Sequence, residues 1–273
     1  MPELPEIETI CRGLRGRLPG RKIVAVQVFD RRLRSPVSQD FSSQLLHRVI
    51  VRVERRGKYI LIFLEEDKVW LSHLGMSGKL ICVKADRHRV KHDHIVAGLS
   101  DGYEVRYHDP RRFGLSLVVS HSELEGLPQL HDLGMDPLDQ RFGGGYLHTA
   151  ARNSKRRIRD LLIDQRVIAG VGNIYANEIL FRAGIRPTRR AWQIARSKLE
   201  SIARETPLLL REAIRWCGTS FSDYRDAEDR FGEFQNHLRV YDREGEPCRV
   251  CGAQIRRVPV GNRSAFYCPK CQR

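Results

Sequence analysis

Short runs in which apolar and polar residues alternate dominate the first half of the chain. These runs cover residues 23–29, 50–53, 59–64, 69–74, 80–83, 94–99, 103–107 and 115–119. Such alternation is typical of strands that bury one face, and many short strands at regular spacing indicate a β-sandwich or barrel. In front of them, apolar residues recur at helical spacing, at Leu4, Ile7, Cys11 and Leu14. A helix is therefore expected to lead into the sandwich.

The pattern changes twice beyond residue 120. Glycine and proline interrupt residues 121–146, which is where we expect a linker. Helical periods follow, over residues 156–164, 175–182, 191–204 and 207–217. The pattern is strand-like again from about Arg239. The expected fold is α+β with two domains, divided into residues 1–120 (helix and sandwich), 121–146 (linker), 147–238 (helical) and 239–273 (cysteine-rich).

The charge balance narrows the class of partner. Lysine and arginine number 48 against 33 aspartates and glutamates, which gives a net charge of +15 over 273 residues. Such a surplus fits a polyanion, although solvated charged faces on a basic protein would give the same composition. The chain has no apolar stretch of membrane-spanning length, and its first residues are acidic where a signal peptide is basic. We expect a soluble, cytoplasmic protein without a membrane partner.

Two CxxC pairs close the sequence. They are Cys248 with Cys251 and Cys268 with Cys271. Four thiolates at this spacing suit a tetrahedral structural zinc, whereas two disulfides would require an oxidising compartment. Four protein ligands leave no position for a reacting water, so one structural Zn²⁺ is expected to shape a hairpin. Arg263 lies on the turn of that hairpin.

The N-terminus offers a candidate nucleophile. Methionine before a small residue is commonly removed, and removal of Met1 would expose Pro2 as a secondary amine. An α-amino group has a pKa of about 8, so part of it is neutral near pH 7 and can act as a covalent catalyst. Glu3 and Glu6 lie three apart beside it. Acidic residues at the start of a helix also stabilise it through the helix dipole. Without further information than these residues, that interpretation is the more common one.

Six motifs, in order along the chain, resemble one family. They are Met1–Glu6, Arg56–Tyr59, Ser72–Met76, Asp109–Gly114, Gly170–Glu178 and Tyr267–Arg273. Together they resemble the formamidopyrimidine-DNA glycosylases of bacterial base-excision repair, over essentially the whole chain. The resemblance implies an N-terminal helix and β-sandwich, a hinge, and a helical domain with a helix-two-turn-helix motif, a base-capping loop and a zinc ribbon. It also implies that the chain acts as a monomer on damaged double-stranded DNA.

The resemblance implies a reaction as well. Pro2 would attack C1′ of the damaged nucleotide and form an iminium, while Glu3 protonates the ring oxygen and Glu6 positions or tunes the site. The iminium would then act as an electron sink for β,δ-elimination of the strand. The implied substrates are 8-oxoguanine and formamidopyrimidines. Lys58 and Arg263 complete the implied catalytic set, and neither a redox nor an organic cofactor is expected.

Further residues are implied to contact DNA. Met76, Arg111 and Phe113 would fill the space that the extruded nucleotide leaves, and their types suit a wedge, a hydrogen-bonding cation and a stacking plate. Lys58 and Asn173 would contact phosphates, although an exposed lysine and a glycine-flanked helix start are also ordinary surface features. The full implied set is Lys58, His73, Met76, Arg111, Phe113, Arg159, Asn173 and Arg263.

Two other functions stay open on the sequence. One is a pyrimidine-preferring glycosylase similar to endonuclease VIII, whose branch generally lacks the three residues that fill the space. The other is a zinc-ribbon DNA-binding protein without catalysis, which would need neither a free Pro2 nor the carboxylate pair. The chain also departs from the family pattern, with Arg159 where lysine is usual and with Asp226–Phe231 in the loop expected to cap the base.

Overall fold

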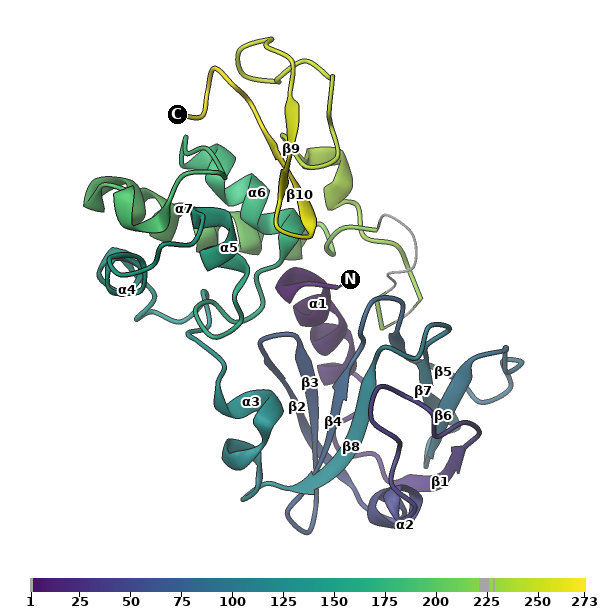
Figure 1. Ribbon diagram of the computed structural model, residues 1–273. Helices are drawn as coiled ribbons and strands as arrows, with labels where there is room; N and C mark the ends of the chain where they lie inside the picture. The colour runs from purple at the N-terminus through teal and green to yellow at the C-terminus, as the bar shows by residue number, and fades with distance from the viewer. Residues whose placement is uncertain (1, 221–225, 228) are drawn as a thin grey trace. The chain divides into compact units, whose positions relative to one another are not determined.

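The chain divides into two compact units. A computed structural model describes residues 2–220, 226–227 and 229–273 (Figure 1). The first unit comprises Met1–His131 with Ile214–Gln235, and the second comprises Asp132–Ala213 with Asn236–Arg273. Each unit is described in its own terms below.

The first unit begins with α1 (Leu4–Arg15). Pro5 lies in its first turn, where a missing N–H costs nothing, and Glu3 and Glu6 form a capping box around the first free backbone groups. The helix buries Ile7, Ile10 and Leu14 on one side, as the apolar spacing predicts. The expected N-terminal helix is therefore confirmed.

Two antiparallel sheets of four strands follow α1. One sheet has the order β1 (Ile23–Val28), β6 (Asp93–Leu99), β7 (Tyr103–His108) and β5 (Lys79–Lys84). The other has the order β2 (Ile50–Arg56), β3 (Tyr59–Leu64), β4 (Lys68–His73) and β8 (Leu115–Ser120). Every predicted strand is present, with ends that differ by a few residues.

The core of the first unit lies between these sheets. Ile60 and Ile62 of β3, together with Ile95 of β6, belong to one buried cluster that also includes the apolar side of α1. Trp70 is fully buried in it, packs edge-on against Phe41 of α2 (Phe41–Leu45) at 6.0 Å, and donates its indole N–H to Ser116 Oγ at 2.8 Å. The fold is thus a β-sandwich with a helix packed against its core.

The short elements of the predicted linker come next. They are η1 (Leu124–Gly126), α3 (Pro128–His131) and, from the glycine-rich end of that segment, α4 (Gly144–Ala151). The helices of the second unit are α5 (Ile158–Ile163), α6 (Asn173–Arg182), η2 (Ala191–Gln193), most of α7 (Arg196–Arg215) and η3 (Phe234–His237), which continues from the first unit. None of the helices in the described ranges has both the length and the apolar character needed to cross a membrane.

The helical periods at 191–204 and 207–217 predict two helices, and this prediction is wrong. Residues 191–193 form the separate turn η2, and α7 runs unbroken through Pro207. Proline removes only one helical hydrogen bond, whereas Leu199, Ile202, Leu209 and Leu210 continue one buried stripe on both sides of it. Packing of that stripe outweighs the local break.

The chain ends in a two-stranded hairpin. Strands β9 (Arg256–Val260) and β10 (Arg263–Tyr267) pair antiparallel, and Asn177 of α6 accepts the N–H of Phe266 at 2.7 Å. The buried carboxylate of Glu178 accepts three consecutive backbone N–H groups, from Arg239 to Tyr241, each at 2.9 Å. Two neighbouring side chains of α6 thereby fix the C-terminal module within the second unit.

We predict that Trp70→Ala lowers the free energy of unfolding by about 3–5 kcal/mol, because it empties the centre of the sandwich. Trp192→Ala serves as the control, since Trp192 is 53% exposed and its loss is expected to cost less than about 1 kcal/mol. Urea denaturation of both variants measures the difference. Equal losses would show that the sandwich core does not depend on Trp70.

Candidate functional site

Pro2 and the two carboxylates predicted beside it lie buried at the start of α1. Glu6 Oε2 accepts the backbone N–H of Glu3 at 2.8 Å. Its other oxygen, Oε1, accepts the backbone N–H of Thr219 at 2.8 Å and the Thr219 hydroxyl at 3.1 Å. Glu6 therefore ties the N-terminus to a segment more than two hundred residues away in the sequence.

The approach of that segment requires a glycine. Gly218 has φ of +78°, and a Cβ there would lie 2.6 Å from Glu6 Oε1. Any other residue would have to displace the carboxylate or strain the backbone. Sequence reasoning missed Gly218 and Thr219, because neither belongs to a recognisable motif. Only the spatial position of Glu6 identifies them.

Lys58 immediately precedes β3, and His73 is the last residue of the adjacent strand β4. Lys58 follows Gly57 at the turn between β2 and β3 and is 5% exposed, so it is not the surface lysine that one alternative suggested. Burial lowers the pKa of His73 to about 3, and the charges of Arg34 and Lys58 lower it further. His73 is therefore neutral near pH 7. Its Nδ1 accepts the N–H of Gly75 at 3.1 Å, which leaves the proton on Nε2 as an available donor.

The structure brings Met76, Arg111 and Phe113 together on two adjacent loops. Met76 is 43% and Phe113 47% exposed, and the Arg111 guanidinium lies 4.7 Å from the centre of the Phe113 ring. The arrangement suits insertion into a base stack.

One buried carboxylate holds these two loops together. Asp109 Oδ1 accepts the Ser77 hydroxyl at 2.8 Å, and Oδ2 accepts the N–H of Gly114 at 2.8 Å. A Cβ at Gly75 would lie 2.5 Å from the backbone of Phe113, so the loops also require a glycine at their contact. Asp109 stands in a recognised motif, but its role as a fastener was not predicted, and Ser77 was missed.

In the second unit, Asn173 is the first residue of α6 and follows the N-cap Gly172. Its side-chain amide donates to the carbonyl of Ser264 on β10 at 3.1 Å. Asn173, which is predicted to contact a phosphate, therefore also holds the hairpin against α6. Gln165 fastens the turn before α6 through bonds to Ile163, Gly170 and Val171 at 2.7–2.9 Å. Gln165 is a further residue that no motif indicated.

Arg159 and Arg263 occupy different environments. Arg263 is exposed at the end of the hairpin turn, as predicted. Arg159 is 1% exposed and pairs with Asp160 at 2.7 Å, and its Nε and Nη2 have no hydrogen-bond partner. Burial lowers the pKa of Arg159, with Asp160 opposing this effect and Arg263 adding to it. The structure thus places the predicted DNA contact Arg159 beneath the surface.

The four terminal cysteines fit a zinc ion. Their sulfurs all lie within 4.8 Å of one another, with 3.9 Å between Cys248 and Cys271 and 3.4 Å between Cys251 and Cys268. Tetrahedral zinc with Zn–S bonds of about 2.3 Å separates its sulfurs by about 3.8 Å. All seven cysteines lie in the described ranges and none forms a disulfide. The cluster holds one structural zinc, as predicted.

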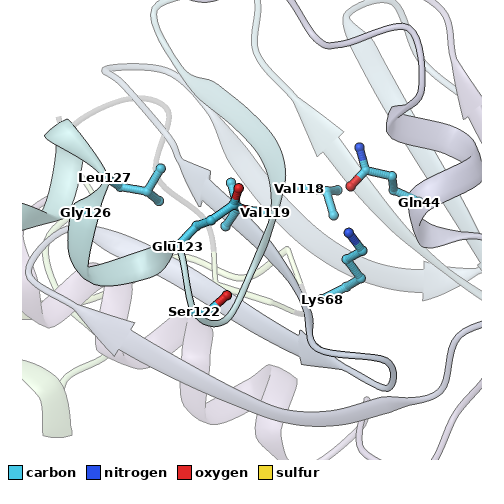
Figure 2. Close-up of a pocket in the computed structure, with 8 residues that line it drawn as sticks. All are labelled: Gln44, Lys68, Val118, Val119, Ser122, Glu123, Gly126 and Leu127. Carbon is cyan, nitrogen blue, oxygen red and sulfur yellow. The ribbon is translucent and has the colours of Figure 1, made fainter.

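One cavity contains none of the predicted site residues, and one predicted loop is only partly described. A cavity of about 600 Å³ in the first unit is lined by Gln44, Lys68 and Glu123 among others, and no predicted site residue contributes to it (Figure 2). The predicted base-capping loop between Gly218 and Gln235 includes residues 221–225 and Glu228, which lie outside the described residues, as does Met1.

Comparisons with known proteins match the chain along its length. Family models match for the formamidopyrimidine-DNA glycosylase N-terminal domain (residues 1–116), the formamidopyrimidine-DNA glycosylase H2TH domain (133–225) and a zinc finger found in FPG and IleRS (245–273). Proteins named formamidopyrimidine-DNA glycosylase from Methylococcus capsulatus and Hahella chejuensis are 44% and 41% identical, each over 100% of both chains.

Solved structures agree with this match. A Lactococcus lactis FPG mutant in complex with DNA containing Fapy-dG is 32% identical with a TM-score of 0.92, over 100% of both chains. The Lactococcus lactis Fpg in complex with DNA containing an abasic site is 30% identical with a TM-score of 0.92, over 99% of both chains.

We predict that removing zinc unfolds the hairpin that carries Arg263, because ligation energy is folding energy for so small a module. Chelation should release one zinc per chain and abolish amide-exchange protection in residues 256–267, while the sandwich strands keep theirs. Metal analysis checks the stoichiometry and hydrogen exchange checks the location. Full protection of the hairpin without metal would refute the structural role.

We predict a pH effect on stability from His73. The folded pKa of about 3 lies below the unfolded value of about 6.5, so below pH 6.5 the unfolded chain binds a proton that the folded chain excludes. Stability should fall by about 1.4 kcal/mol per pH unit at this site, or about 2 kcal/mol from pH 7 to 5. Urea unfolding of wild type and His73→Asn isolates the effect, and identical pH profiles would contradict it.

Proposed function

This chain belongs to the formamidopyrimidine-DNA glycosylase family and is a DNA glycosylase that acts on damaged DNA, and on that premise we propose that it excises oxidised purines through Pro2 and then cuts the strand. The observation that carries the proposal is the buried start of α1, where Pro2 adjoins Glu3 and Glu6. Removal of Met1 would turn Pro2 into a secondary amine at this position.

The first chemical step is base excision. The Pro2 nitrogen attacks C1′ of the damaged nucleotide and gives up its own proton. The glycosidic bond breaks, and the base leaves with the electron pair of that bond and takes up a proton. Glu3 gives a proton to the ring oxygen O4′, so that the sugar opens and C1′ becomes an iminium carbon. Glu6 is a positioning residue in this scheme, because its carboxylate binds the Glu3 backbone and Thr219 rather than the substrate.

The second step is strand cleavage. The iminium withdraws electrons from C2′, a proton leaves C2′, and the 3′-phosphate departs by β-elimination. A further δ-elimination releases the 5′-phosphate. Each step uses the covalent intermediate as the electron sink. Zinc takes no part, because its four sulfur ligands leave no open position.

The preference for oxidised purines rests on Met76, Arg111 and Phe113. All three are exposed on loops that Asp109 fastens, which suits filling the stack and contacting the partner base. A glycosylase similar to endonuclease VIII is the second candidate, and it would not need this set. A panel of duplexes that carry 8-oxoguanine, Fapy-dG or oxidised pyrimidines distinguishes the two.

The proposed partner is damaged duplex DNA. The Lactococcus lactis relatives are complexes with Fapy-dG and abasic-site DNA, and the net charge of +15 favours a polyanion. Lys58, His73, Asn173 and Arg263 are the proposed phosphate contacts. Arg159 contributes in this proposal through its charge beside Arg263.

We predict that Glu3→Gln lowers the rate of 8-oxoguanine excision by about 10²- to 10⁴-fold, because it removes the proton donor for ring opening. Strand cleavage at a preformed abasic site should fall less, since that sugar opens without glycosidic cleavage. Single-turnover assays on both duplexes measure how far each of the two rates falls. Glu54→Gln, an exposed carboxylate on β2, is the charge control and should leave both rates unchanged. Equal losses on both substrates would argue against Glu3 as the acid.

We predict that Pro2→Gly lowers excision at least about tenfold, or about 1.4 kcal/mol of barrier, because the replacement amine is primary and unconstrained. Binding to undamaged duplex should stay near wild type, since the phosphate contacts are untouched. Protein that retains Met1 should lack both excision and strand cleavage, because an amide nitrogen has no available lone pair. Full activity with Met1 retained would refute the proposed function.

A further inference from the structure

The second unit contains a pocket that the proposed chemistry does not use. It has a volume of about 770 Å³ and is lined by Arg152, Asn153, Lys155, Arg190, Trp192 and Gln193. The first three lining residues follow α4, and the last three lie at η2. A volume of this size is in the range of small-ligand pockets.

The backbone presents Trp192 at a fixed place. Its N–H donates to the carbonyl of Ser154 at 3.3 Å, and the N–H of Ala191 donates to Arg156 at 2.9 Å. The Arg190 guanidinium adds a bond to the carbonyl of Lys155 at 2.8 Å. The two segments that form the pocket are therefore joined to each other, yet the Trp192 side chain stays 53% exposed. A rigid frame that leaves an indole in solvent suits a stacking surface.

The charges around the indole are unbalanced. Arg152, Lys155 and Arg190 are all exposed, the lining includes no acidic residue, and none of the three has an ion pair with any residue in the described ranges. Two other exposed arginines of this unit do have acidic partners, since Arg141 pairs with Asp139 and Arg156 pairs with Asp164. The pocket thus combines one aromatic plate with three available cations.

We propose that this pocket binds an unpaired deoxynucleotide segment, with a base stacked on Trp192 and the flanking phosphates at Arg152, Lys155 and Arg190. Stacking on aromatic side chains beside cations is how proteins hold single strands without reading their sequence. Each base in a duplex is already stacked between the adjacent bases, so only an unpaired base can stack on the indole of Trp192. The inference goes beyond excision and requires none of its steps.

A three-nucleotide probe tests the pocket directly. In a Trp216→Phe background the fluorescence of the exposed tryptophan comes from Trp192, because Trp70 is fully buried. We expect 5′-phosphorylated thymidine trinucleotide to quench this fluorescence saturably, with a log–log salt slope near about −2 for three phosphate contacts on a single strand. Absence of saturable quenching would overturn the proposal.

Variants separate stacking from charge attraction. In equilibrium dialysis, we expect the trinucleotide to bind wild-type protein at one site. Its affinity should fall by about 5- to 150-fold in Trp192→Ala and stay unchanged in Trp216→Ala. Arg152→Gln should make the salt slope of the quenching shallower by about 0.7, whereas Arg204→Gln, an exposed arginine paired with Glu205, should not. An abasic trinucleotide that binds as tightly as the thymidine probe would refute the stacking.

Binding of the trinucleotide does not depend on whether Pro2 is the nucleophile. The probe carries no lesion, and Pro2→Gly protein should bind it as wild type does. Loss of excision with intact quenching would count against the proposed function alone, and intact excision without quenching would count against the pocket alone.

Discussion

The carboxylate of Glu6 sets the geometry on which the rest of the candidate site depends. It accepts the N–H of Glu3 on one oxygen and two donors of Thr219 on the other. A buried carboxylate is tolerated only when such donors replace its water shell, so these bonds hold it in one place. Because Glu6 also caps α1, the same interaction starts the helix, anchors the segment at Gly218 and Thr219, and fixes where Pro2 lies.

The other groups of the site are held in the same way, by buried polar side chains that join distant segments. Asp109 fastens the two loops that present Met76, Arg111 and Phe113. Asn177 fastens the C-terminal hairpin to α6, and Glu178 fastens the backbone of Arg239–Tyr241 that precedes it. Arg263 and the side chains of Met76, Arg111 and Phe113 are exposed, while the polar groups that position them are buried. Such support reduces the conformational freedom that binding would otherwise have to remove.

Much of this arrangement follows from sequence. The alternating runs predict every strand of the sandwich, because side chains alternate between the two faces of a β-strand. The spacing of the two CxxC pairs predicts the zinc site. The local period could not reveal that α7 continues through Pro207, since tertiary packing decides that. Thr219, Ser77 and Gln165 escaped prediction because their roles depend on partners brought near by folding. The sequence also could not show that Lys58 and Arg159 are buried. The domain boundaries and the roles of the site residues stay predictions.

The central claim is that the amine of Pro2, positioned by the start of α1, forms the covalent bond to DNA. The most direct measurement is borohydride reduction of wild-type protein on 8-oxoguanine duplex, followed by proteolysis and mass spectrometry of the trapped peptide. The account predicts that the sugar remnant is attached to the N-terminal nitrogen of a peptide that begins at Pro2. A remnant mapped to Lys58, or to any peptide that still carries Met1, would contradict it.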